Sequence, residues 1–226
     1  MSVVIYRNML NAEMKRFGEF SKTIANNLKH NNIETSIIFD DKKYRCLSNI
    51  QNHNTIIFIA HGSADTIYHK YDHKYDNHQP LINKENASVL KDKKVIAISC
   101  GTAKILGPYA CTYAGCKVYL GFLHKIHFNK KNEKPCSKKY REFLTICYKN
   151  CFAEIIEKAI LEKWNFSKLA LILKLKLNKT VVERAQLISK SKPMYYRYHG
   201  FDQAILAVTN VADNINVFGN DREIVE

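Results

Sequence analysis

A histidine and a cysteine each follow a short apolar run, and each is followed by a glycine. The run TIIFIA leads to His61 and Gly62, and the run KVIAIS leads to Cys100 and Gly101. Apolar runs that end abruptly are typical of buried parallel strands, and chemistry gathers at the carboxyl ends of such strands. If the two strands are neighbours, they lie about 4.8 Å apart, so an imidazole and a thiol can reach one substrate. Because a Cys with a nearby His is the minimal nucleophile and base for acyl transfer, the pattern predicts a cysteine peptidase.

The size and composition indicate one globular domain over residues 1–226. The chain has 226 residues, of which 46% are hydrophobic, and a chain of this length can bury a large core. No apolar run approaches the roughly 20 residues that cross a membrane, and residues 3–6 are too short for a signal peptide. We therefore expect a cytoplasmic protein that makes no contact with a membrane.

The chain has 7 cysteines, an odd number, and we expect them to be reduced thiols in the cytoplasm. Cys111 and Cys116 are too far apart for a CxxC motif, so they and most other cysteines are interpreted as small packing residues. Only Cys100 has the sequence context of a nucleophile. The histidines of residues 69–78 lack partners at ligand spacing, so no metal site is expected there; these histidines are His69, His73 and His78.

The formal net charge of +14 points towards an acidic partner. Most of the basic residues are Lys rather than Arg, and Lys, Asn and Ile are abundant together, which is typical of an AT-rich genome. The Arg clusters that nucleic-acid sites favour are absent from the sequence, so specific nucleic-acid binding is not expected. The charge would instead help to capture an acidic protein substrate.

The order of expected elements gives the fold class. Strand, helix and strand within residues 2–39 form a βαβ unit, which requires a parallel pair. The full set implies an α/β fold of three layers, with a mostly parallel sheet of about six strands, helices on both faces and a C-terminal β-hairpin at the edge. The expected strands are 2–6, 33–39, 54–60, 94–98 and 117–122, followed by a closing hairpin over 204–219. The expected helices are 12–31, 85–90, 108–114, 140–164 and 169–189, the last with a strand over 169–177 as the alternative; residues 45–53 are interpreted as a connector and the repeat at 69–76 as a protruding hairpin.

In this order, the chain resembles the caspase-like fold of clan CD cysteine peptidases, and within it the bacterial caspase-like domains of the CHAT type. The resemblance covers most of the chain, and its motifs are short. They are the strand with His61-Gly62, the strand with Ser99-Cys100-Gly101-Thr102, the helix that ends in Ala114-Gly115 before a strand, and the tail that ends in Phe218-Gly219-Asn220.

The resemblance implies a role for each site residue. His61 would be the general base and acid, Cys100 the nucleophile, and the backbone N–H groups of Gly62 and Cys100 the oxyanion hole. Arg7, Asn8 and Ser99 would line the substrate pocket, where Arg7 would favour an acidic P1 residue unless it is a surface arginine. Caspases carry Gln-Ala before the nucleophile, whereas Ser99 stands here, so specificity for Asp does not follow.

The resemblance also implies regulation. Such enzymes are held inactive until a protein partner or self-cleavage remodels the active-site loops, and the lysine-rich loop 124–139 is a candidate cut site. They commonly serve bacterial stress or antiviral responses, and they imply no cofactor.

Two other classes of protein share parts of the pattern. A Cys-nucleophile α/β-hydrolase predicts a G-x-C-x-G elbow, but Ile98 and Thr102 occupy the glycine positions. A non-catalytic interaction module on the same fold retains both residue types without using them, and the sequence leaves this alternative open.

Overall fold

The described sheet has six strands, in the order β2-β1-β3-β6-β7-β8. The computed structural model of the chain describes residues 2–9, 12–70, 78–126 and 138–225. All neighbouring strands are parallel except β8, which runs antiparallel to β7 at the edge. This confirms the predicted α/β class with a mostly parallel sheet. The strands are β1 (Ser2–Arg7), β2 (Glu34–Ile38), β3 (Thr55–Ile59), β6 (Lys94–Ile98), β7 (Val118–Phe122) and β8 (Ile215–Gly219).

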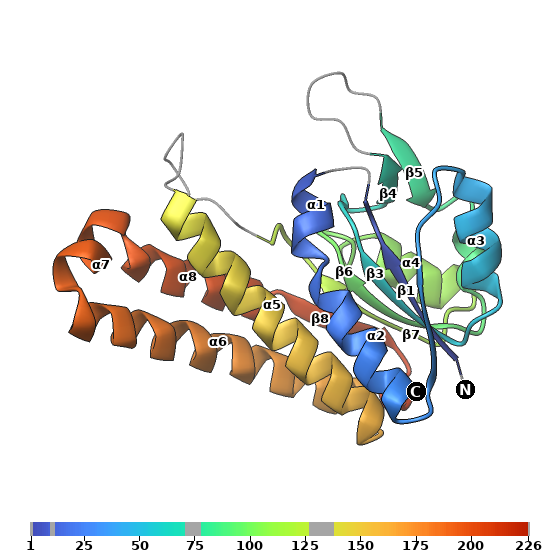
Figure 1. Ribbon diagram of the computed structural model, residues 1–226. Coiled ribbons are helices and arrows are strands. Elements are labelled where there is room, and N and C mark those ends of the chain that lie inside the picture. Colours follow the sequence, from blue (N-terminus) through green and yellow to red (C-terminus); the bar gives the residue numbers. More distant parts are fainter. Residues whose placement is uncertain (1, 10–11, 71–77, 127–137, 226) are drawn as a thin grey trace.

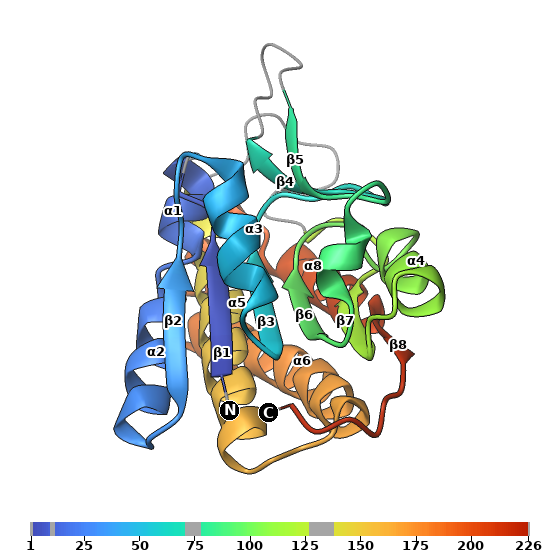
Figure 2. The ribbon, with the colours of Figure 1, turned by 90° about the vertical axis from the view of Figure 1, so that its right-hand side faces the viewer.

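Helices cover both faces of the sheet, as expected for strands that are apolar on both sides (Figures 1 and 2). On β1, Val3 and Ile5 belong to one core, and Val4 and Tyr6 belong to the other. The first core lies under α1 (Ala12–Phe17), α2 (Phe20–His30), α5 (Lys138–Leu161), α6 (Phe166–Ser191) and α8 (Phe201–Asp213). The second lies under α3 (Lys43–Gln51), the 3-10 helix η1 (Ala87–Leu90) and α4 (Leu106–Tyr113).

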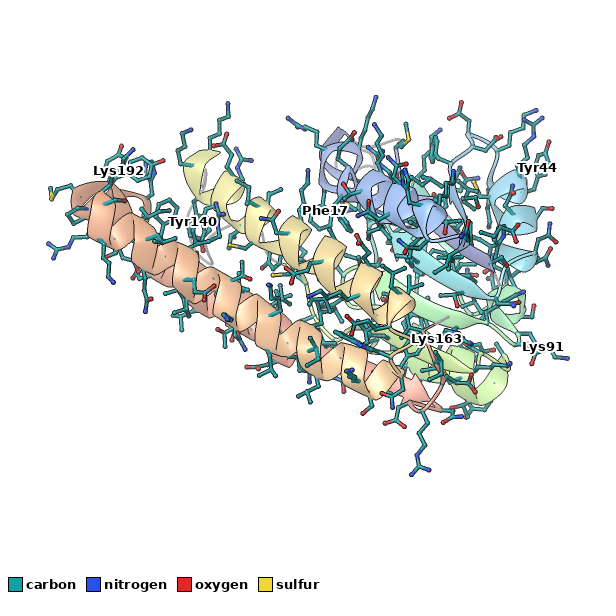
Figure 3. All side chains as sticks on the ribbon, turned by 60° about the horizontal axis from the view of Figure 1, so that its bottom comes forward. Phe17, Tyr44, Lys91, Tyr140, Lys163 and Lys192 are labelled. Atoms are coloured by element: carbon teal, nitrogen blue, oxygen red, sulfur yellow. The ribbon has the colours of Figure 1, made fainter. Side chains whose placement is uncertain are left out.

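The helices α5, α6 and α8 extend well beyond the sheet, towards α7 (Pro193–His199). In Figure 3, Tyr140 and Lys192 lie towards the far end of this extension, while Tyr44 lies at the opposite end of the molecule. The helix predicted over 169–189 is therefore confirmed as part of α6, and the strand alternative for 169–177 is wrong. Residues 140–164 are likewise helical for most of their length, in α5.

The single helix predicted over 12–31 is broken between α1 and α2. The Arg7 Nη2 atom donates a hydrogen bond to the Lys15 carbonyl oxygen at 2.6 Å. A continuous helix would use that oxygen for the N–H of Glu19, which instead lies 3.5 Å from the Arg16 oxygen. The same arginine forms an ion pair with Glu19, so its two contacts hold the break in place.

The closing hairpin predicted over 204–219 is half wrong. Its second run is β8, which forms the antiparallel edge, but its first run is the helix α8. Buried residues on α8 recur at helical spacing: Phe201, Ala204, Val208, Val211 and Ala212. These small and β-branched residues pack against the rest of the first core, and that tertiary packing overrides their strand propensity.

Two smaller elements also differ from expectation. Most of residues 45–53, predicted as a connector, belong to the helix α3, and the helix predicted over 85–90 is only the 3-10 turn η1. The hairpin expected near the tandem repeat is present as β4 (Ile67–Lys70) and β5 (Gln79–Ile82). The repeat itself extends over 71–76, which lies outside the described residues.

Candidate active site

His61 and Cys100 each lie two residues beyond the end of a strand, β3 and β6, at the carboxyl edge of the sheet. The register of β3 and β6 pairs Thr55 with Lys94 and continues with a constant offset to Ile59 and Ile98. His61 and Cys100 each lie two residues beyond the last paired residues, so the same offset continued past the strand ends would set them opposite each other. Neighbouring strands lie about 4.8 Å apart, so the backbone brings the predicted pair together.

The pleat directs both side chains towards the same face. Ile59 and Ile98 lie in the core under α1, α2 and α5, and Cys100 packs against that core as well. Because side chains two residues apart point to the same face of a strand, His61 is expected on that face too. Both residues are only partly exposed. The pair therefore lies at the boundary between the core and the surface.

Gly62 is packed against the turn that carries Cys100. A Cβ atom added at Gly62 would lie 2.8 Å from the Cys100 carbonyl oxygen and 2.7 Å from the Thr102 Cγ2 atom, and it would overlap Ser99 Oγ. Real Cβ atoms do not approach other atoms this closely, so only glycine fits at this position. The sequence motif His-Gly thus reflects close contact between two strand ends.

Replacing Gly62 by Ala is expected to lower the free energy of unfolding by about 1–3 kcal/mol, because the added methyl overpacks the junction. Urea unfolding measures this loss. Lys104→Ala, at an exposed position that follows the same turn, serves as the control and should unfold like the wild type. Equal free energies of unfolding for the two variants would show that the contact between Gly62 and the Cys100 turn can rearrange without loss of stability.

The loop that follows His61 is fixed by backbone hydrogen bonds. The His61 carbonyl accepts from the Tyr68 N–H at 2.9 Å, and the Ser63 N–H donates to the Thr66 oxygen at 2.9 Å. The Ala64 oxygen accepts from the first two residues of the α4 turn, at 3.0 and 2.9 Å. The hydroxyl of Ser63 donates to the Asp65 carboxylate and lowers the pKa of that group. This loop is therefore anchored to both β4 and α4.

The turn at Cys100 is held by the end of β7. Gly101 has a φ of +73°, which favours glycine, and its N–H donates to the His124 oxygen at 3.0 Å. The Ala103 N–H donates to the Phe122 oxygen at 3.1 Å. The Ile126 N–H donates to the Cys100 sulfur at 3.3 Å. Ile126 is thus a site residue that the sequence analysis missed, because its contribution is a backbone group and no side-chain type encodes it.

Tyrosines of α5 lie near Cys100 on the core side. Burial raises the pKa of Tyr148 well above its usual value, and Tyr140, Cys147 and Cys100 act in the same direction. Tyr148 is completely buried. It therefore belongs to the buried wall behind Cys100.

The three predicted pocket residues are buried, and two of them make structural contacts. Arg7 is 3% exposed and binds Glu19 and the α1 backbone. The Asn8 amide donates to the carbonyl oxygens of Tyr68 and His69, at 3.1 and 3.0 Å, which ties the end of β1 to β4. Ser99 lies against Gly62, and within the described residues its buried hydroxyl has no hydrogen-bond partner. Of the three, only Ser99 lies beside the His61–Cys100 pair.

The described histidines of the tandem region have structural contacts. The His69 Nε2 atom lies 3.1 Å from the Asp41 carbonyl oxygen, and its Nδ1 atom lies 3.0 Å from the Tyr6 hydroxyl. Because a carbonyl can only accept, Nε2 carries a proton. The His78 ring packs against the Tyr68 ring in a tilted arrangement. His73 lies outside the described residues. Across the described ranges, no group of three or more His, Cys, Asp or Glu side chains is arranged to hold a metal ion.

None of the helices in the described part of the chain has the length and apolar character needed to cross a bilayer. No protein-family model matches the chain, and no curated protein sequence matches it. The chemistry that the site can support therefore rests on its own geometry, in which a thiol and an imidazole follow the ends of two adjacent parallel strands.

Proposed function

We propose that the protein is a cysteine endopeptidase that cleaves a protein substrate with Cys100 as nucleophile and His61 as base. The observation that supports this proposal is the parallel pairing of β3 with β6, because the two residues follow the carboxyl ends of these neighbouring strands. The contact of Gly62 with the Cys100 turn supports it, because it fixes the distance between the two strand ends. The caspase-like resemblance agrees with both observations.

In the proposed reaction, His61 takes the thiol proton as the Cys100 sulfur attacks the scissile carbonyl carbon. The N–H groups of Gly62 and Cys100 stabilise the developing oxyanion, and the loss of one such donor costs about 3 kcal/mol. His61 then protonates the leaving amine, which departs and leaves a thioester on Cys100. Water, deprotonated by His61, hydrolyses the thioester and regenerates the thiol.

The proposed substrate is an acidic protein, which the net charge of +14 would attract. Arg7 would favour an acidic P1 residue only by exchanging its present partner, because Glu19 already binds its guanidinium. Ser99, beside Gly62, is better placed to contact substrate. Arg7 and Asn8 are secondary proposals as residues that line the substrate pocket.

The proposed regulation acts through the segment that leaves β7. The Ile126 N–H holds the Cys100 sulfur, and residues 127–137, which follow it, lie outside the described residues. A protein partner, or self-cleavage within 124–139, would shift this segment and change the orientation of the sulfur. A cytoplasmic role in a bacterial stress or antiviral response is part of the same proposal.

The second candidate function is a catalytically silent interaction module. The observation that favours it is the contact between the Ile126 N–H and the Cys100 sulfur, which ties the thiol to the protein's own backbone. Such a contact is compatible with a sulfur that does not attack a substrate. The two functions differ in whether Cys100 can be acylated or alkylated by a substrate-like probe.

The test is intact mass after exposure to peptidyl acyloxymethyl ketones with varied P1 residues. We expect one adduct on the wild type and none on Cys100→Ala, whereas the control Cys147→Ala, which removes a fully buried thiol, keeps the adduct. An adduct that appears only in cell lysate indicates an enzyme that needs an activator. No adduct under either condition supports the silent module. The same spectra test self-cleavage, since fragments cut within 124–139 should be present for the wild type and absent for Cys100→Ala.

A further inference from the structure

Thr102 lies in the turn that carries Cys100, and its side chain contacts three neighbouring strands near their ends. This side chain is completely buried. Its Cγ2 atom packs against Gly62, after β3, since a Cβ atom added at that glycine would lie 2.7 Å from it. A Cβ atom added at Gly121, on β7, would lie 3.4 Å from its Oγ1 atom. The hydroxyl donates a hydrogen bond to the Ser99 carbonyl oxygen, just after β6, at 3.4 Å.

The orientation of the Thr102 side chain is fixed by these contacts and by the backbone. The Thr102 carbonyl oxygen accepts a hydrogen bond from the Gly107 N–H at 2.9 Å, in the first turn of α4. Threonine carries two branches at Cβ, which restrict its χ1 angle. Because the methyl group and the hydroxyl meet different strands, rotation about χ1 would break both contacts at once.

The carbonyl group that accepts from Thr102 belongs to the same peptide unit as the Cys100 N–H. A peptide unit is planar and trans, so its C=O and N–H bonds point in opposite directions. The hydrogen bond from Thr102 to the Ser99 oxygen therefore sets the direction of the Cys100 N–H as well. In the proposed reaction, this N–H is one of the two donors of the oxyanion hole, and the other donor belongs to Gly62, against which the Thr102 methyl group packs.

We propose that Thr102 is a positioning residue whose hydroxyl aims the Cys100 N–H at the oxyanion. This inference rests on the proposed peptidase function. Donors stabilise a developing oxyanion most when their direction is set before the reaction begins. Without the hydroxyl, the Ser99–Cys100 peptide unit could rotate, and the N–H would lose alignment while the sulfur and the imidazole stay in place. Thr102 itself would touch neither the substrate nor the reacting atoms.

The experiment compares two reactions of Cys100 that differ in their need for an oxyanion hole. With iodoacetamide, the sulfur–carbon bond forms, iodide leaves and the thiol proton passes to solvent, so no oxyanion develops. With a peptidyl aldehyde, the sulfur adds to the carbonyl carbon, the π electrons move to the oxygen, and the thiol proton passes to His61 or to that oxygen. The resulting thiohemiacetal protects Cys100 from iodoacetamide. The aldehyde carries the P1 residue that the ketone series prefers, and peptide mass spectrometry reads labelling at Cys100 alone.

Thr102→Val keeps the shape of the side chain and removes the hydroxyl. We expect its rate with iodoacetamide to match the wild type, whereas the aldehyde should protect at least about 10-fold less well, towards the roughly 10²–10³-fold that loss of a whole donor costs. Thr102→Ser keeps the hydroxyl and should retain most of the protection. Thr55→Val is the matched control, because Thr55 is also completely buried but lies at the first residue of β3, the far end of the strand from His61. It should match the wild type in both reactions.

The outcomes separate this role from the proposed function. Equal protection of Thr102→Val and a wild type that peptidyl ketones label would overturn the positioning role and leave the peptidase standing. Equal losses of Thr102→Val in both reactions would also overturn it, since the whole turn would then have moved. A loss in Thr102→Ser as large as in Thr102→Val would assign the effect to the methyl group instead of the hydroxyl. If neither ketone nor aldehyde reacts with wild-type Cys100, with or without cell lysate, the peptidase proposal fails and this role fails with it.

Discussion

Replacing His61 by Ala is expected to slow labelling of Cys100 by a peptidyl ketone about 10²–10⁴-fold near pH 7. The imidazole follows the strand that neighbours the one leading to the thiol, and under the proposed function it would generate the thiolate that attacks the probe. An ordinary thiol ionises near pH 8.5, so the difference from the wild type should shrink above about pH 9, where the thiolate forms without a base. Labelling rates measured across this pH range test both the size and the shape of the effect.

A nearby histidine supplies the control for that measurement. The side chain of His124 is exposed, and the contribution of this residue to the site is its carbonyl oxygen, which accepts from Gly101. His124→Ala keeps that oxygen, so its labelling rate should match the wild type. Equal rates for His61→Ala and His124→Ala would exclude His61 as the base. A pH-independent loss in His61→Ala would indicate a structural role instead.

Replacing Phe152 by Ala is expected to lower the free energy of unfolding by about 3–5 kcal/mol. Phe152 is completely buried on α5, and its ring contacts aromatic rings from α1, α2, the sheet and its own helix. The ring centroids lie 6.3, 6.1, 5.9 and 6.1 Å away, in Phe17, Phe20, Phe122 and Tyr148. Alanine cannot fill the space that the Phe152 ring occupies between these elements, so a cavity should remain.

Chemical unfolding of Phe152→Ala measures the loss, and Ile146→Ala on the same helix is the control. Ile146 is 39% exposed, so its replacement should cost well under half as much as that of Phe152. A cost below about 1 kcal/mol for Phe152→Ala would mean that the helices collapse into the space. Such a collapse would contradict the tight aromatic packing described above.

The strand ends could be predicted from the sequence because each signal is local. A buried parallel strand is an apolar run, and the residue that ends it is visible in the sequence. The relative register of β3 and β6 is not local, because it depends on how the two strands pair. The sequence therefore predicted the pair of His61 and Cys100 only on the condition that their strands are neighbours, and the pairing of Ile59 with Ile98 meets that condition.

Other features could not be predicted for a related reason. The break after Phe17 depends on Arg7, which lies on β1 and donates a hydrogen bond to the Lys15 carbonyl oxygen. The buried residues of α8 recur at helical spacing, but the β-branched residues of this segment favoured the prediction of a strand. In each case a contact between distant segments, or a fold of the chain, outweighed the local propensity.

The pairing of β7 with β8 has a consequence for the order in which the protein is made. Val118 pairs with Gly219 and Phe122 with Ile215, so β7 has no partner on this side until the ribosome has made residues 215–219. Until then its edge is open to pairing with other chains. The backbone at the end of β7 also holds the Cys100 turn, through Phe122, His124 and Ile126. The nascent chain would therefore complete the surroundings of its candidate nucleophile only after residues 215–219 have been made, nearly a hundred residues after β7 itself.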